Sequence, residues 1–186
     1  GANETGSEES YENPRYIRIT DFGDDGKLRK ETFKSLAPEK ANEYLLEEGD
    51  ILFARSGATV GKSFQFKNYN GIACFAGYLI RARPEPKMII SDFLYLYTKS
   101  GAYENWKGSI FSQATIQNIG ADKFAFLFIP LPPINEQNQI VHHIETECNR
   151  IDEQVERTQK LIELLSEYRT ALIGEVVTGK VRVAGN

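Results

Sequence analysis

The feature that most constrains the fold is a long segment near the C-terminal end, residues 135–176, which contains no proline and one glycine. Positions separated alternately by four and three residues are mostly apolar, the spacing of a heptad seam. Roughly 40 helical residues form a rod of about 60 Å at 1.5 Å per residue. A small domain cannot cover such a rod, so its apolar seam predicts a partner helix from another copy or another protein. The seam residues assigned to this contact are Ile144, Ile151, Val155, Ile162, Leu165 and Leu172.

The residues before this segment have a shorter periodicity that predicts strands. Alternating or continuous apolar runs bounded by turn residues are typical of strands. These runs are residues 16–20, 51–54, 63–66, 71–83 and 122–133, the last closed by prolines.

Two segments predict short helices, residues 36–46 with Pro38 near the start and residues 91–100 with a Ser-Asp cap. The polar stretch 103–123 is interpreted as a loop. The predicted fold class is α+β: a mixed, β-rich globule followed by a long C-terminal coiled-coil-forming helix. The expected boundaries are residues 1–133 for the globule, 134–178 for the helix and 179–186 for a tail.

Charge and cysteine content limit the function classes. The net charge is −4, with 16 Lys and Arg against 17 Asp and Glu up to Ile129, and 6 against 9 from Pro130 onward. The acidic helix is therefore not expected to lie along DNA, whereas the nearly neutral globule can carry a local basic face. The two cysteines, in distant segments, fit a reducing cytoplasm. No apolar run is long enough to span a bilayer, so we expect a cytoplasmic protein.

The stretch ARSGATVGKS, residues 54–63, comes close to a phosphate-binding P-loop. That motif needs four residues between its first glycine and the Gly-Lys pair, and it opens a helix. Here three residues intervene, and the alternating residues after Lys62 predict a strand. We therefore interpret the stretch as a glycine-rich turn whose polar side chains can touch a phosphate backbone.

No complete catalytic or metal-binding set is recognisable. PLPPIN, residues 130–135, lacks the polar residue and the aromatic ring that adenine methyltransferases place around a Pro-Pro pair. The adjacent His142 and His143 have no further histidine at helical spacing with which to share a metal. We expect a protein that is not an enzyme, with no catalytic residue, no metal and no cofactor.

Three stretches in this order resemble the DNA specificity subunits of type I restriction-modification systems: residues 48–62, 112–141 and 171–181. The specific part is a strand followed by Pro-Pro-x-x-Glu-Gln and then by a long helix ending in TGKV. The resemblance implies a target recognition domain that reads one half of a bipartite site in double-stranded DNA. It further implies that the long helix docks the modification (methyltransferase) and restriction subunits, which perform the chemistry.

Candidate DNA-binding residues follow from this resemblance and from their side-chain chemistry. Lysine, arginine and serine contact phosphates, whereas amides and hydroxyls read base edges. We assign Arg55, Ser56 and Lys62 to the backbone, Gln113, Thr115 and Asn118 to the base-facing loop, and Arg15 and Arg18 to the flank.

The resemblance leaves alternatives open. The sequence holds one module, so the helix pairs either with a second copy, giving a homodimer, or with another specificity half. The family's globule also has a further strand ahead of the stretch matched by residues 1–7, which is absent here. The competing hypotheses are an inactive truncated cassette and a coiled-coil adaptor that binds no DNA.

Overall fold

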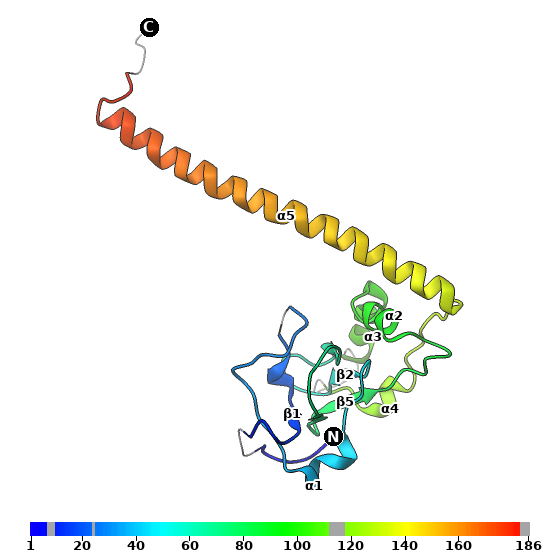
Figure 1. Ribbon diagram of the computed structural model, residues 1–186. Helices are drawn as coiled ribbons and strands as arrows, with labels where there is room; N and C mark the ends of the chain where they lie inside the picture. Colours follow the sequence, from blue (N-terminus) through cyan, green and yellow to red (C-terminus); the bar gives the residue numbers. More distant parts are fainter. Residues whose placement is uncertain (7–9, 24, 112–117, 183–186) are drawn as a thin grey trace. The chain divides into compact units, whose positions relative to one another are not determined.

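The structure, a computed structural model, describes residues 1–6, 10–23, 25–111 and 118–182. The chain separates into two compact units, Gly1–Val141 and His142–Asn186 (Figure 1). The first unit holds the strands and the short helices, and the second holds most of one long helix. The predicted α+β class, with a β-containing globule and a long C-terminal helix, is confirmed.

Among the described residues of the first unit, five short strands form two small sheets. Their bounds are β1 Arg15–Ile17, β2 Ile51–Ala54, β3 Ser63–Gln65, β4 Ala73–Phe75 and β5 Leu79–Ala82. β1 and β4 pair in parallel, and β2 is the central strand of an antiparallel sheet in the order β3-β2-β5. Every residue of β2 is buried, as its uninterrupted apolar sequence requires.

The prediction of a single strand at residues 71–83 is wrong. The segment forms two strands, β4 and β5, which belong to different sheets. The chain turns between them, where the Leu79 N–H donates to the Ala76 carbonyl at 2.9 Å. The Gly77 N–H donates to the Ala2 carbonyl at 2.7 Å, so the N-terminal residues pack into this turn. A Cβ at Gly77 would lie 1.9 Å from the Asn3 Oδ1 atom, so any larger residue would require the Asn3 side chain to move.

The helices of the first unit are short. They are α1 Pro38–Ala41, α2 Ser91–Tyr97, α3 Gly101–Phe111 and α4 Ala121–Phe124, with 3-10 turns at Ile19–Asp21 and Asn42–Tyr44. The predicted helices at 36–46 and 91–100 are present but shorter. The interpretation of residues 103–123 as a loop is wrong for its first part, which lies in α3. The strand expected at 16–20 ends at Ile17 because the following residues form a 3-10 turn.

The prediction of a strand at residues 122–133 is also wrong. Its beginning forms α4, and residues 127–133 have no regular structure. The Phe124 ring packs 4.6 Å from the Phe53 ring and 5.2 Å from the Trp106 ring, between centroids. Leu127 and Ile129 pack against the same cluster. Phe124, Leu127 and Ile129 are therefore used in the core, whereas Phe126 and Phe128 are exposed, and the backbone does not join a sheet.

The long helix α5, Ile134–Val177, has 44 residues and spans about 66 Å. Its first turn is bound to the globule by Gln137, whose side chain is fully buried. The Gln137 Oε1 atom accepts from the Ile90 N–H at 3.0 Å, and Nε2 donates to the carbonyls of Met88 at 2.9 Å and Pro132 at 2.8 Å. One glutamine thus satisfies three backbone groups that no helix or sheet ladder pairs.

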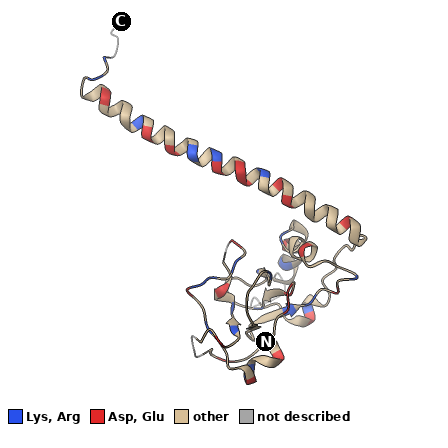
Figure 2. Ribbon diagram, in the orientation of Figure 1, with Lys and Arg blue, Asp and Glu red and all other residues tan. Residues whose placement is uncertain are grey.

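The second unit exposes the apolar seam expected from the heptad spacing. Ile151, Val155, Ile162 and Leu165 are all more than half exposed. Acidic and basic residues are interspersed along α5 (Figure 2), with ion pairs such as Lys160–Glu156 at 2.8 Å. In the described part of the chain, no helix has the length and apolar character needed to cross a membrane.

Candidate nucleic-acid interface

The glycine-rich stretch forms a tight turn between β2 and β3. The Gly61 N–H donates to the Ala54 carbonyl at 2.8 Å, and the Ala54 N–H donates to the Lys62 carbonyl at 2.9 Å. Gly57 and Gly61 have φ values of 86° and 78°, which only glycine adopts without strain. The strand predicted after Lys62 is confirmed as β3, so the stretch does not open a helix as a P-loop does.

A second segment lies against this turn and completes the site. Ser56 and Asn118 form an isolated antiparallel bridge, and the Ile119 N–H donates to the Arg55 carbonyl at 2.9 Å. Ile119 is fully buried and anchors the segment, whereas the side chains of Arg55 and Asn118 are exposed. Three of the predicted DNA-binding residues are thereby brought together from distant parts of the sequence.

The other two residues assigned to the base-facing loop, Gln113 and Thr115, lie outside the described residues. They fall between the end of α3 and the bridge at Asn118.

Lys62 lies in a groove of about 370 Å³ that is lined by the turn and by residues of α3 and the end of α2. Lys99 and Lys107 line the same groove, together with one acidic residue, Glu104. The Lys107 ammonium pairs with Glu104 at 2.8 Å, while Lys99 Nζ lies 3.0 Å from Ser63 Oγ. Three lysines and one carboxylate line this groove within the described residues, an excess of positive charge that makes the groove electropositive.

Burial lowers the pKa of Lys99, and the positive charges of Lys62 and Lys107 lower it further. The Glu104 carboxylate opposes this shift. A charge that is penalised by its like-charged neighbours is stabilised when an anion enters the groove, and this property suits a phosphate-binding surface. Sequence reasoning missed Lys99 and Lys107 because nothing in their spacing relates them to the turn.

Arg15 and Arg18, expected to flank the DNA, meet at the buried Asp21 carboxylate. The Arg18 Nε atom lies 3.2 Å and the Arg15 Nη2 atom 4.0 Å from its oxygens. Arg15 is 5% exposed, with its guanidinium between the rings of Phe33 and Tyr69. Both arginines therefore have structural partners, and their contact with DNA remains a prediction.

The remaining reactive groups of the globule do not form a metal site or an activated nucleophile among the described residues. Within the described residues, no three His, Cys, Asp or Glu side chains gather as metal ligands would. Burial raises the pKa of the Cys74 thiol to about 12, so this cysteine stays protonated and is a poor nucleophile. The cationic and amide groups around the turn are suited to binding a polyanion.

Comparison with known proteins gives a consistent result. The family model "Type I restriction modification DNA specificity domain" matches residues 3–164. The chain is 34% identical over 137 residues to the EcoKI specificity subunit of Escherichia coli K12, and 30% identical over 142 residues to the StySPI specificity subunit of Salmonella potsdam. These matches cover 71% and 73% of this chain, but 29% of each relative. The match thus spans less than a third of the curated relatives.

Two solved structures share the fold. One is described as "Structural basis underlying complex assembly and conformational transition of the type I R-M system", with a TM-score of 0.67, 20% identity and coverage of 86% of this chain and 43% of that one. The other is the HsdS subunit from Thermoanaerobacter tengcongensis, with a TM-score of 0.61, 19% identity and coverage of 75% and 36%.

Proposed function

Because the chain belongs to the type I restriction modification DNA specificity family, we propose that its globule reads one half of a bipartite site in double-stranded DNA. The observation that carries the proposal is the convergence of the 54–63 turn, the Asn118 segment and the lysine groove on one part of the globule. Amide and hydroxyl groups there face base edges, and the lysines contact phosphates.

The turn is suited to this role because hydrogen bonds and a buried side chain within the globule order it. Its backbone hydrogen bonds and the buried Ile119 hold Arg55, Ser56 and Asn118 in place. A pre-ordered surface loses less conformational entropy on binding than a loop that must fold onto the duplex. Gln113 and Thr115 keep their assignment to the base-facing loop.

We further propose that α5 is the assembly element. Its exposed apolar seam pairs with the matching helix of a second copy or of another specificity half, and the helix docks the modification and restriction subunits. Support comes from the exposure of Ile151, Val155, Ile162 and Leu165 in a helix whose remaining surface is charged. A homodimer would read two identical half-sites in inverted orientation.

Methylome sequencing tests the proposal. The chain would be expressed with its modification subunit in a host that lacks DNA methylation, and methylated bases mapped across the genome. One bipartite motif is the expected result, and palindromic half-sites would indicate pairing of two copies. If both proteins are soluble and copurify but no motif is methylated, the chain is an inactive cassette. If they neither methylate nor copurify, the adaptor hypothesis replaces the proposal.

A matched pair of variants locates the reading surface. Asn118→Ala removes an exposed amide beside the turn, whereas Asn138→Ala removes an exposed amide on α5. We expect Asn118→Ala to weaken methylation of the motif or relax one of its positions, and Asn138→Ala to leave the motif unchanged. A changed motif with Asn138→Ala, or none with Asn118→Ala, would contradict the assignment of Asn118.

A further inference from the structure

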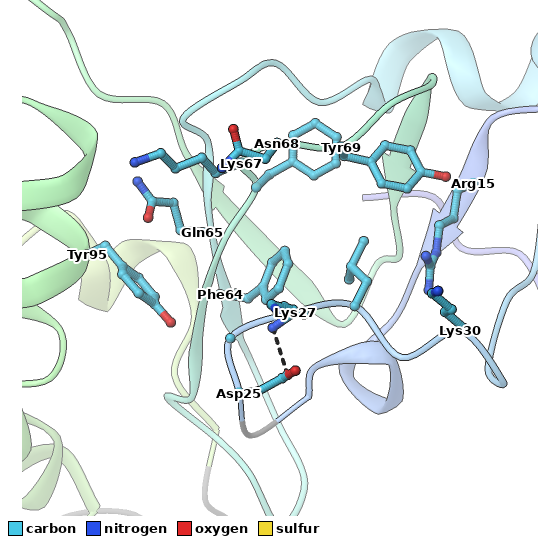
Figure 3. Close-up of a pocket in the computed structure, with 13 residues that line it drawn as sticks. Arg15, Asp25, Lys27, Lys30, Phe64, Gln65, Lys67, Asn68, Tyr69 and Tyr95 are labelled. Carbon is cyan, nitrogen blue, oxygen red and sulfur yellow. Dashed lines mark hydrogen bonds between the residues drawn. The ribbon is translucent and has the colours of Figure 1, made fainter. Parts of the chain in front are cut away.

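A second cationic cleft lies in the globule, and of the residues assigned above it includes Arg15. It has a volume of about 710 Å³ and separates the 25–30 turn from residues 64–69. Lys67 and Gln65 lie at one end and Arg15 and Lys30 at the other, with Lys27 between them (Figure 3). Four basic residues line the cleft, and one acidic residue, Asp25, is among its described lining residues. This is an unusual local excess of positive charge in a chain of net charge −4.

The buried side of the cleft is itself electropositive. Arg15 and Arg18 both lie near the carboxylate of Asp21, so among the described residues one positive charge is in excess there. The Arg15 Nε atom is buried and has no hydrogen-bond partner among the described residues. Coulomb interactions are screened less beneath the surface than in water, so this charge raises the affinity of the cleft for an anion.

The rim of the cleft carries two lysines with available ammonium groups. Lys27 and Lys30 are exposed, and neither forms an ion pair within the described residues. Lys67 differs, because its ammonium lies 2.7 Å from the Asp92 carboxylate. Tyr69 and Tyr95 supply aromatic surface to the same walls. Lysines around apolar walls match a sugar-phosphate chain, which presents anionic oxygens next to apolar sugar carbons.

The cleft continues the lysine groove of the proposed DNA interface. Lys99 lines the groove, and its Nζ lies 4.5 Å from the centroid of the Tyr95 ring, which lines the cleft. β3 joins the two from the other side, with Ser63 in the groove and Gln65 in the cleft. This continuity favours a polymeric anion that follows both surfaces over a small anion that fills only one.

We propose that this cleft holds the sugar-phosphate backbone of the DNA beside the recognised half-site, with Lys27 and Lys30 as phosphate contacts. The inference rests on the proposed function and extends its binding surface. Arg15 is buried, so it attracts the DNA phosphates through its charge and does not contact them directly. The two lysines add affinity and set the position of the duplex but carry no sequence information.

The test is the salt dependence of DNA binding by the full chain copurified with its modification subunit. Wild type and Lys27→Gln/Lys30→Gln would be titrated with a duplex containing the mapped motif and with a scrambled duplex, at several salt concentrations. Each lost phosphate contact lowers the slope of log K against log salt by about 0.9, so the double variant should lose about 1.8. Affinity should fall by the same factor for both duplexes. Lys87→Gln, an exposed lysine outside both surfaces, should leave the slope unchanged.

An unchanged slope in the double variant, with the wild-type complex binding DNA normally, overturns the inference and leaves the proposed function standing. Equal affinity of the wild-type complex for both duplexes contradicts the proposed function, while the slope on the scrambled duplex still decides the role of the cleft. A wild-type complex that binds neither duplex overturns both. Inorganic phosphate is the final probe. If micromolar phosphate displaces DNA from the wild-type complex, the cleft is a site for a small anion, and the inference is overturned.

Discussion

Gln137 is the residue whose replacement most directly tests how the globule is joined to α5. Gln137→Met keeps an unbranched apolar chain of similar length but removes one acceptor and two donors. The Ile90 N–H and the carbonyls of Met88 and Pro132 then lose their partners. A net loss of about 1 kcal/mol for each bond gives a fall of about 3 kcal/mol in the free energy of unfolding.

The assay is urea denaturation of the full chain, followed by fluorescence and checked by calorimetry. A domain of this size loses about 3 °C of Tm per kcal/mol, so the expected decrease in Tm is about 10 °C. The control is Gln139→Met, the same change at an exposed position two residues later, which should stay within about 0.5 kcal/mol of wild type. A Gln137→Met variant as stable as the control would refute the reasoning.

Gln137→Glu adds a test with a defined pH dependence. The introduced carboxylate would face two carbonyl oxygens in a fully buried position, so its pKa in the folded state is raised above the unfolded value. The unfolded chain loses its proton first as the pH rises, and the folded state is progressively disfavoured. Stability relative to wild type should therefore be highest below about pH 4 and fall as the pH rises above it. A penalty independent of pH would show that the carboxylate reaches solvent.

Three further predictions use single substitutions. Lys99→Met removes an ammonium group that Lys62 and Lys107 repel. DNA affinity should therefore fall, while the Tm measured without DNA should not. A fall in both DNA affinity and Tm would argue for a structural role of Lys99. Leu165→Asp places a charge in the exposed seam, so light scattering should show reduced self-association without loss of folded globule. Asp21→Asn leaves buried guanidinium charge uncompensated and should cost about 3–5 kcal/mol in urea denaturation; a loss below about 1 kcal/mol would contradict the pairing.

Local patterns predicted the elements whose structure depends on near neighbours in the sequence. The heptad spacing and the absence of proline predicted a helix at 134–178, and α5 spans Ile134–Val177. The apolar run at 51–54 predicted β2, and the failed P-loop spacing correctly indicated a turn between two strands. Hydrogen bonds in helices and tight turns join residues a few positions apart, so sequence spacing largely determines them.

The tertiary structure decided the features that need distant partners. The apolar residues of 122–133 are compatible with a strand, but Phe124 packs against the rings of Phe53 and Trp106, and no strand in the described part of the chain pairs with that segment. The lysine groove and the cationic cleft assemble charges from elements far apart in the chain. Composition gives the number of such charges, but only folding gives their distances. Because Coulomb energy depends on distance, a chain with a net charge of −4 can present an electropositive surface to DNA.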